Sequence, residues 1–560
     1  MNDRAHDLAV LAKNRATGVQ QVSRTAPGGM VDHGLDLAVI GNGRTAALVD
    51  PCSRIVWWCY PRFDGDPIFC RLLSGREEKG FSDVLLEDMV DYQSQYVRNT
   101  AIVSTILTDR HGAKVRITDL APRFRQFGRV FRPPQLYRII EPLSGLPRIT
   151  IRMRPTCDYG KSLPHRSLGS NHIRYADDST VIRLTTDAPL SLIDGEAPFV
   201  LTRPLHLVFG PDEPFTGDLQ ATCRDFIDRT HDYWMDWVRR LSISYDWQEA
   251  IIRAAITLKL SNFDETGAVV AAHTTSIPES PSSGRTWDYR YCWLRDAYFV
   301  VQALNRIGAT RTMEEFISFT LSIAAKPDEE LHPLYSVVPT TTIHERTAPD
   351  LQGYRGDGPV RIGNAAVNQV QHDAYGSVIL AAIAMRLGLE SRAKYWNGIA
   401  EPLHAELLER AWNQRRGAFT AAFGSDDLDA SVLLLADLGV VEVDDPRFAS
   451  TVAAMERELV REKHVMRYAS ADDFGMPVTA FLICRFWLID ALWSLGRRDA
   501  ARDLFADAMQ HRNRYGLLSE DVDPQSGALW GNFPQTYSMA GLILSAMRLS
   551  RSWEDRYWRG

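Results

Sequence analysis

Hydrophobic and polar residues alternate in short runs over residues 33–215. Runs such as RIVWWCY and AIVSTILTD are rich in β-branched and aromatic residues, and Gly, Asp, Asn and Pro separate them. Short alternating runs between turn residues are typical of half-buried strands. Many such strands in succession predict an N-terminal β-sandwich. We expect the polar, glycine-rich residues 1–32 to form a flexible lead.

The periodicity becomes helical after residue 215. Residues 216–244 are predicted to form a linker helix, and apolar positions recur at helical spacing over 245–560. We expect about ten helices there, at 246–261, 294–307, 310–326, 372–388, 391–413, 428–439, 446–460, 478–496, 497–513 and 536–557. A run of strands followed by a run of helices predicts a multidomain β + α protein. Recurring helix hairpins predict a toroid of paired helices.

Composition and charge narrow the function classes. The 560 residues are 45% hydrophobic and 24% charged, a composition that excludes general disorder. The net charge of -7 disfavours nucleic acids and anionic lipids as binding partners. The longest apolar stretch, FLICRFWLIDALWSL, is interrupted by Arg485 and Asp490 and is too short to span a membrane. Seven cysteines without CxxC spacing, and an N-terminus without an apolar leader, favour a cytoplasmic location.

The strongest local pattern is RTWDYRYCWLRDA at residues 285–297. Four aromatic residues alternate along it, so an extended segment would place them on one face: Trp287, Tyr289, Tyr291 and Trp293. Arg295 and Asp296 follow at the start of a helix. Aromatic faces suit the C–H faces of a pyranose, and an Arg beside an Asp can bind sugar hydroxyls. A core strand that ends in an ion pair is an equally good interpretation.

A second candidate is the acidic segment at residues 516–538. Glu520, Asp521 and Asp523 crowd one loop between two helices. Neighbouring carboxylates raise one another's pKa and can hold a water for deprotonation. A solvated acidic turn is the more common alternative.

A third candidate is the glycine-rich loop at residues 353–376. It carries Arg355 and Arg361 and leads into a predicted helix, so it could bind hydroxyls or be an ordinary loop before a helix N-terminus. Its glycines lack P-loop spacing. His372 has no second histidine at metal-ligand spacing, so we predict no metal site.

Together these segments resemble glycoside hydrolase family 15, in the branch with an N-terminal trehalase-like β domain. DLAVIGNGRTAALVDPCSRIVWWCYPRFDGDPIFCRLL is similar to the start of that branch. RTWDYRYCWLRDA, GYRGDGPVRIGNAA, FLICRFWLIDAL and GLLSEDVDPQSGALWGNFPQ are similar to blocks of its catalytic domain, in the same order. The resemblance implies an (α/α)6 barrel with a loop-lined pocket. It implies inverting hydrolysis of an α-glucosidic bond at a non-reducing glucose, of trehalase or glucoamylase type, with no metal or cofactor.

The resemblance also implies roles for individual residues. Glu520 matches the general base of the family. The positions that match contacts to the terminal glucose are Tyr289, Trp293, Arg295, Asp296 and Arg467. The local pattern adds Trp287, Arg355 and Arg361 as candidate substrate contacts.

The second carboxyl group that an inverting enzyme needs has no obvious match. In the family it is a Glu that follows a Trp, after the helix predicted at 372–388. Here Trp396 and Trp412 are each followed by Asn. A barrel of this type needs twelve helices, so the loss of one helix hairpin near residues 383–396 would explain both differences. The general acid is therefore unassigned, with Glu401 and Glu406 as the first substitutes.

Three functions remain open at this level. The first is an exo-acting α-glucosidase that releases glucose from trehalose or from malto- or isomalto-oligosaccharides. The second is a sugar-binding or regulatory homologue that has kept the glucose pocket and lost the acid. The third is a phosphorylase on the same barrel, for which Arg355 and Arg361 give weak support. The expected partner is a small carbohydrate, and a homo-oligomer is compatible with the sequence.

Overall fold

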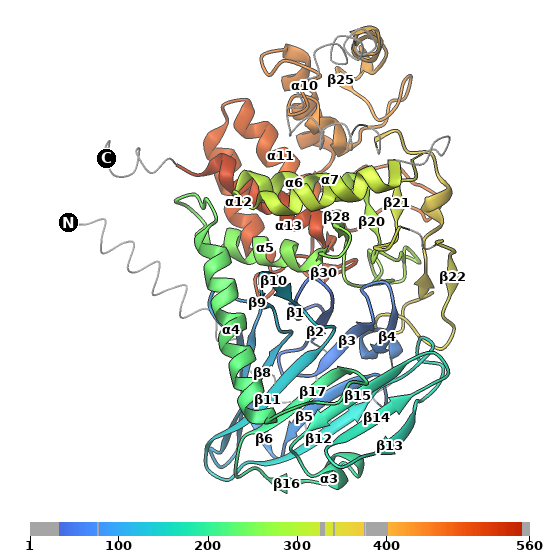
Figure 1. Cartoon of the computed structure of the whole chain (residues 1–560). Coiled ribbons are helices and arrows are strands. Elements are labelled where there is room, and N and C mark those ends of the chain that lie inside the picture. The colour runs from blue at the N-terminus through green and yellow to red at the C-terminus, as the bar shows by residue number, and fades with distance from the viewer. Residues whose placement is uncertain are drawn as a thin grey trace, which may run out of the picture.

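The computed structural model describes residues 33–75, 78–324, 331–339, 342–373, 376 and 401–551. Strands fill the lower half of the molecule in Figure 1, and helices fill the upper half. The expected flexible lead, residues 1–32, lies outside the described residues. So does nearly all of the helix expected at 372–388.

The N-terminal strands form two antiparallel sheets. Across the first sheet the order is β1 (Ala38–Gly41), β2 (Ala46–Val49), β3 (Ile55–Tyr60), β5 (Phe81–Leu86), β12 (Arg148–Arg154) and β16 (Phe199–Val200), with β4 (Asp66–Phe69) beside β3. Across the second it is β13 (His165–Leu168), β14 (His172–Ala176), β15 (Val181–Thr186), β17 (Leu205–Pro211), β11 (Leu136–Ser144), β8 (Lys114–Leu120), β7 (Val103–Asp109) and β6 (Met89–Tyr96). Apolar side chains from both sheets join one core, which confirms the predicted sandwich.

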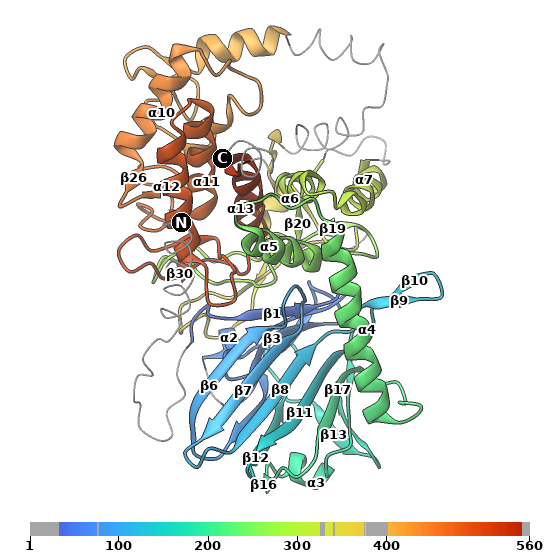
Figure 2. The same ribbon diagram turned by 90° about the vertical axis from the view of Figure 1, so that its left-hand side faces the viewer.

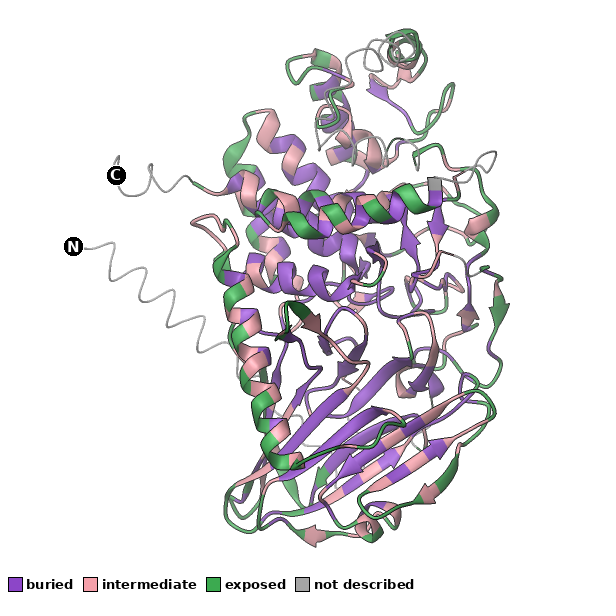
Figure 3. Ribbon diagram, in the orientation of Figure 1, coloured by how far each residue is buried: buried purple, intermediate pink, exposed green. Residues whose placement is uncertain are grey.

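The strands differ in burial according to what covers them. Buried and half-buried positions alternate along β7, because one of its faces meets the core and the other meets solvent. Every position of β3 is buried (Figure 3), because loops that precede α6 pack against it. The indole nitrogen of Trp57 on β3 donates to the carbonyl oxygen of His273 at 2.8 Å. The helical part therefore rests directly on the first sheet.

One buried arginine joins the two sheets. Arg138 on β11 has no solvent exposure, and its guanidinium bonds both carboxylate oxygens of Asp119 on β8, at 2.7 and 3.1 Å. The same guanidinium donates across the sandwich to the carbonyl oxygens of Ser53, at 2.6 Å, and Ser82, at 3.3 Å. A buried charge needs such a complete set of partners.

We predict that Arg138→Ala lowers the free energy of unfolding by about 3–5 kcal/mol, because it leaves the Asp119 carboxylate buried without its counter-ion. Urea unfolding followed by circular dichroism measures this. The double variant Arg138→Met, Asp119→Leu removes both charges and should be more stable than Arg138→Ala. Equal stability of the single variant and the native chain would contradict the prediction.

The helical part begins with α4 (Leu219–Arg239), which Asp218 caps by accepting from the amide of Ala221 at 3.2 Å. The other α-helices are α5 (Gln248–Ser261), α6 (Leu294–Arg306), α7 (Thr310–Ala324), α10 (Pro446–Glu458), α11 (Leu482–Ser494), α12 (Arg498–Ala508) and α13 (Thr536–Leu549). Helices α6 and α7 pack as neighbours, as do α11 and α12, and α13 packs against α5, α6 and α11. We propose domain boundaries of 33–215 for the sandwich, 216–244 for the linker helix and 245–560 for the helical barrel.

Two of the expected helices differ in detail. Over 428–439 the chain forms a short 3₁₀ helix, η2 (Ala430–Leu434), followed by turns. Within 391–413 the described residues are helical over 401–410 and then enter a two-residue strand, Trp412–Asn413. Over so few residues an α-helix and a 3₁₀ helix place apolar side chains at nearly the same spacing. Hydrophobic periodicity therefore cannot distinguish the two kinds of helix here.

Candidate active site

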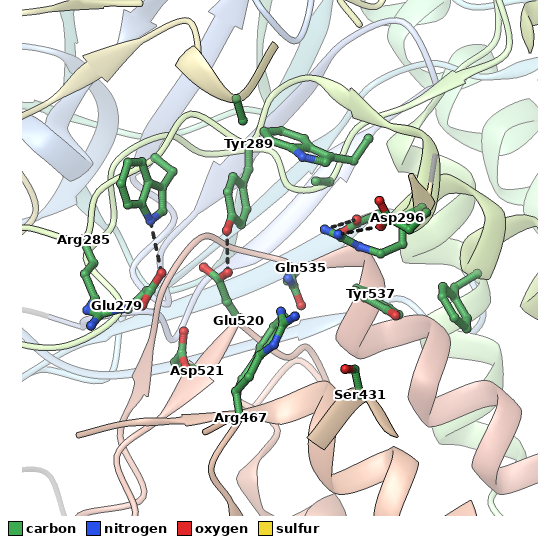
Figure 4. A pocket seen from close by; sticks show the side chains of 18 of the residues that line it. Glu279, Arg285, Tyr289, Asp296, Ser431, Arg467, Glu520, Asp521, Gln535 and Tyr537 are labelled. Atoms are coloured by element: carbon green, nitrogen blue, oxygen red, sulfur yellow. Dashed lines mark hydrogen bonds and ion pairs between the residues drawn. The ribbon is translucent and has the colours of Figure 1, made fainter. Parts of the chain in front are cut away.

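A cavity of about 780 Å³ lies where the loops before α6, α11 and α13 converge (Figure 4). This volume is typical of a site for a small molecule. Its wall includes most of the candidates taken from the sequence: Trp287, Tyr289, Trp293, Arg295, Asp296, Arg467, Glu520 and Asp521. Segments separated by more than two hundred residues therefore meet in one place.

The aromatic segment 285–297 contributes three of its four alternating rings to the cavity wall. Tyr291 is not among the lining residues and packs in a small apolar cluster with Leu334 and Ile343. Within the segment only β20 (Cys292–Trp293) is a strand. Strict alternation of faces requires a continuous strand, so the prediction of a common face was wrong for Tyr291.

A fully buried ion pair fixes the course of this segment. Asp288 and Arg290 have no solvent exposure, and their carboxylate and guanidinium meet at 2.7 and 2.9 Å. Arg290 also donates to the carbonyl oxygen of Gly65, in the loop between β3 and β4, at 2.7 Å. Asp288 accepts from the amide of Gly363 at 3.1 Å. The pair thus ties the aromatic segment both to the β-sandwich and to the glycine-rich loop.

Glu520 lies on the cavity wall at the start of a small sheet. The strands are β28 (Ala480–Phe481), β29 (Asp521–Val522) and β30 (Leu529–Trp530), in that order. The carbonyl oxygen of Glu520 accepts from the amide of Leu482 at 2.9 Å, and Tyr289 donates its hydroxyl to Oε1 at 2.7 Å. Oε2 has no hydrogen-bond partner, although Glu520 is only 5% exposed. An unpartnered carboxylate oxygen in a cavity is available to a water or a substrate hydroxyl.

Gly531 gives Glu520 the space it occupies. A Cβ at this position would lie 2.6 Å from the Cβ of Glu520 and 2.9 Å from its Oε2, and the φ of Gly531 is +72°. Any residue other than glycine is therefore disfavoured at this position, both by the close contact with Glu520 and by the positive φ. The glycine in GALWGNFPQ therefore has a packing role beside the carboxylate.

Three carboxyl groups lie together on this wall: Glu520 and Asp521 are buried, and Glu279 is half-buried. Burial, and then the charge of Glu279, raise the pKa of Glu520 to about 8, against an opposing hydrogen bond from Tyr289. Burial and the charge of Glu520 raise the pKa of Asp521 well above its usual value. Burial likewise raises the pKa of Glu279, which accepts from the indole nitrogen of Trp287 at 3.1 Å. Such a cluster shares its protons, so the pKa values belong to the group as a whole.

Another part of the wall carries the Arg–Asp pair from the sequence motif. Arg295 lies 3.4 Å from Asp296 and donates to Asp373 at 3.0 Å. Burial raises the pKa of Asp296, against the opposing charge of Arg295. Arg467 is held by Asp429 at 3.3 Å. Three charged groups anchored in this way can bind several hydroxyls of one sugar.

The remaining sequence candidates lie away from the cavity wall. Arg361 pairs with Glu345 at 2.8 Å and lies over the ring of Trp287, 5.2 Å from its centre. Arg355 is exposed and lies over the rings of Tyr354 and Trp530. Neither arginine is among the residues that line the cavity. The basic subsite that a phosphorylase would need is not formed by these two.

Three acidic residues considered from the sequence, Asp523, Glu401 and Glu406, also lie outside the cavity wall. Asp523 accepts from the hydroxyl of Ser526 at 2.5 Å in an exposed turn. Glu401 is exposed, and Glu406 is exposed and pairs with Arg410 at 2.5 Å. None of the three lines the cavity.

The cavity also contains residues that sequence reasoning did not single out. Glu279, Gln535 and Tyr537 line it. Gln535 accepts from the amide of Ser538 at 3.1 Å and so caps α13, which holds it at the wall. A cap before a helix is a recognisable sequence signal, but Glu279 stands in an irregular loop with no local pattern around it.

The described residues contain no group of three or more His, Cys, Asp and Glu side chains that could hold a metal ion. No helix within the described ranges is long and apolar enough to cross a membrane.

Comparison with known proteins agrees with this arrangement. The model of glycosyl hydrolases family 15 matches residues 246–387, 381–499 and 494–547, and the trehalase-like N-terminal model matches 32–192. The chain therefore belongs to glycosyl hydrolases family 15 and is a glycoside hydrolase with a carbohydrate substrate. A bacterial glucoamylase solved with acarbose superposes with a TM-score of 0.64, at 14% identity, over 95% of this chain and 96% of that one. This confirms the predicted fold, a β-sandwich followed by a helical barrel.

Several curated relatives align over nearly the whole chain. A protein of Thermoplasma volcanium named trehalase is 28% identical over 92% of this chain and 93% of its own length. A protein of Mycobacterium tuberculosis, also named trehalase, is 27% identical over 93% of this chain and 90% of its own length.

The same comparisons bear on the expected loss of a hairpin. The alignment with the Thermoplasma volcanium protein covers 585 positions, more than the 560 residues of this chain, so the relative contains segments that this chain lacks. The first two matches to the family model overlap at residues 381–387, within the region where the hairpin was expected. Residues 377–400 lie outside the described residues, so the missing hairpin stays a prediction.

The pKa directions predict how activity depends on pH. A carboxylate must be ionised before it can accept a proton from water, so a reaction that uses Glu520 as base should accelerate as pH rises through about 8. Glu279→Gln removes a carboxyl group that shares protons with Glu520 and should move this limb of the kcat/KM profile to lower pH. Tyr289→Phe removes a stabilising hydrogen bond and should move it higher.

Asp523→Asn is the matched control for these variants, because it removes a carboxylate of the same loop outside the cavity. Its pH profile should coincide with that of the native chain. A limb near pH 4.5 in the native chain, the ordinary pKa of a glutamate, would contradict the prediction.

Proposed function

We propose that this protein hydrolyses trehalose with inversion at the anomeric carbon and releases glucose. The observation that carries the proposal is the buried Glu520 carboxylate with one free oxygen, in a cavity that also holds the anchored Arg295, Asp296 and Arg467. The names of the relatives that align along more than nine-tenths of this chain support trehalose as the substrate. Seven cysteines without a disulfide among them support a cytoplasmic location.

In this proposal Glu520 removes a proton from the attacking water. Tyr289 holds the carboxylate in place through the 2.7 Å hydrogen bond. Arg295, Asp296 and Arg467 bind hydroxyls of the terminal glucose, and the rings of Tyr289 and Trp293 contact its C–H faces. Water attacks the anomeric carbon, the bond to the leaving oxygen breaks, and that oxygen takes up a proton.

The source of the second proton distinguishes this chain from an ordinary member of its family. In the interval where the family places its Trp–Glu segment, Trp396 and Trp412 are each followed by Asn, and Glu401 and Glu406 are outside the cavity wall. Glu279 is a half-buried carboxyl group on the wall whose pKa is raised by burial and which has no role in the steps above. A raised pKa keeps a carboxyl protonated, which is the state that an acid requires. We propose Glu279 as the substitute acid, and a weakly active sugar-binding homologue as the alternative.

The role of Glu520 is tested by Glu520→Gln, which keeps the shape of the side chain and removes its basicity. Turnover of trehalose should fall by roughly 10²–10⁴-fold, while binding of a glucose-like iminosugar, measured by calorimetry, should survive. Asp523→Asn serves as control and should keep its turnover. Near-native turnover by Glu520→Gln would point to Asp521 as the base.

The missing acid is tested with a substrate whose leaving group needs no proton. α-Glucosyl fluoride should be hydrolysed much faster than trehalose, by on the order of 10²–10⁴-fold if no residue supplies a proton. If Glu279 supplies it, Glu279→Gln should slow trehalose hydrolysis and leave fluoride hydrolysis nearly unchanged. Equal effects of this variant on both substrates would exclude Glu279 as the acid. Assays with and without phosphate, with β-glucose identified as first product, separate hydrolysis from phosphorolysis.

A further inference from the structure

Three exposed apolar side chains lie at the edge of the active-site cavity. Phe474, Met476 and Val478 are 43%, 48% and 58% exposed, and they stand at alternate positions of the loop between β27 (His464–Val465) and β28. This loop belongs to the helical part of the molecule, which stands above the sandwich in Figure 2. Val478 and its neighbour Pro477 line the cavity. We call Phe474, Met476 and Val478 the apolar rim, since exposed apolar residues that gather beside a cavity are typical of ligand-binding surfaces.

The loop of the apolar rim is fixed against the aromatic segment 285–297. The ring of Phe474 meets the ring of Trp287, a residue of the cavity wall, edge-on with 5.4 Å between the ring centres. The guanidinium of Arg285 donates to the carbonyl oxygen of Gly475 at 2.9 Å. Contacts on both sides of Phe474 hold the rim in place, so a ligand that binds there has little chain left to order.

Four charged side chains lie close to the apolar rim. The guanidinium of Arg285 is 5.5 Å from the centre of the Phe474 ring, and it lies 3.6 Å from the carboxyl group of Glu279. The same guanidinium pairs with Asp472. Asp473, next to Phe474 in the chain, is exposed. Three of these four groups are acidic, so an anionic ligand is disfavoured at the rim and an uncharged one is not.

The apolar rim lies on the side of the cavity where the leaving group of the proposed reaction belongs. Glu279 lies on one side of Glu520 in Figure 4, and Asp296 lies on the other. In that reaction the terminal glucose lies with Asp296, and Glu279 gives its proton to the leaving oxygen. The leaving group is then beside Glu279, which accepts from the indole nitrogen of Trp287 at 3.1 Å. Because Phe474 packs on Trp287, the apolar rim is the next surface that the leaving group meets.

We propose that the apolar rim binds the leaving group of an α-glucoside that carries an uncharged alkyl chain. The glucose part occupies the end of the cavity at Asp296, and the chain leaves the cavity over Val478 and Phe474. The inference rests on the proposed function for the placement of the glucose and of the leaving oxygen. Trehalose consists of two sugars without an alkyl chain, so binding at the rim and hydrolysis of trehalose are measured separately.

Calorimetry with hexyl α-glucoside and methyl α-glucoside tests the proposal. The full chain is used as its Glu520→Gln variant, so that the glucosides are bound and not consumed. Full burial of one methylene group strengthens binding by roughly fourfold. A rim covers only part of each methylene group, so the hexyl compound should bind about tenfold more tightly than the methyl compound.

Substitutions in the apolar rim, added to Glu520→Gln, locate the alkyl chain. Phe474→Ser and Val478→Ser should each bring the ratio of the two affinities towards one. Phe474→Leu keeps an apolar side chain and should keep most of the ratio, which separates lost contact with the ligand from a disturbed loop. Phe423→Ser is the matched control, because Phe423 is 48% exposed and does not line the cavity, and it should leave the ratio unchanged.

The outcomes separate this inference from the proposed function. Equal binding of the two glucosides, no binding of either, or a ratio that both serine variants leave intact would overturn the proposal even if the native chain hydrolyses trehalose. A tenfold ratio that depends on the rim, in a chain that does not hydrolyse trehalose, would support the rim and contradict the proposed substrate. If maltotriose binds more tightly than hexyl α-glucoside and Phe474→Ser removes that gain, the rim holds a further sugar, and the assignment of an alkyl chain is overturned.

Discussion

The buried ion pair between Asp288 and Arg290 is the interaction on which the active site depends. It connects three parts of the chain that are far apart in sequence: the loop between β3 and β4, the aromatic segment, and the glycine-rich loop. Two charges without solvent exposure are stable only when all their partners are in place. The β-sandwich therefore does more than support the barrel, since its Gly65 carbonyl completes the set of partners that orients the aromatic rings of the cavity wall.

Burial also sets the chemistry of the carboxyl groups. Glu279, Glu520 and Asp521 share one wall, and each loses water and faces the charge of a neighbour, so all three hold their protons more tightly than in solution. A site that must both remove and donate a proton can use such a cluster, because binding of the substrate redistributes protons within it. Tyr289 biases this distribution by stabilising the ionised form of Glu520 through its hydroxyl.

The arrangement of the helical barrel explains how a chain can belong to the family and still lack the Trp–Glu segment at its usual place. Glu520, which we propose as the general base, directly precedes β29 of the small sheet next to α11 and α13, and the described structure contains these elements in full. The segment that would supply the acid belongs to a separate hairpin. A hairpin on the rim of a toroid contacts mainly its neighbours, so the predicted loss of this hairpin would leave the cavity wall around Glu520 and the fold in place while it removed the proposed source of one proton.

The sequence by itself determined the sandwich, the later helices, the resemblance to the family and the main charged and aromatic candidates for the cavity wall. The reason is that apolar periodicity and turn residues act locally and that Tyr289, Trp293, Arg295, Asp296 and Glu520 stand in continuous motifs. Only the tertiary structure decided which side chains face the cavity. Tyr291 points away because its segment is not a regular strand, Arg355 and Arg361 serve other contacts, and Glu279 joins Glu520 across more than two hundred residues.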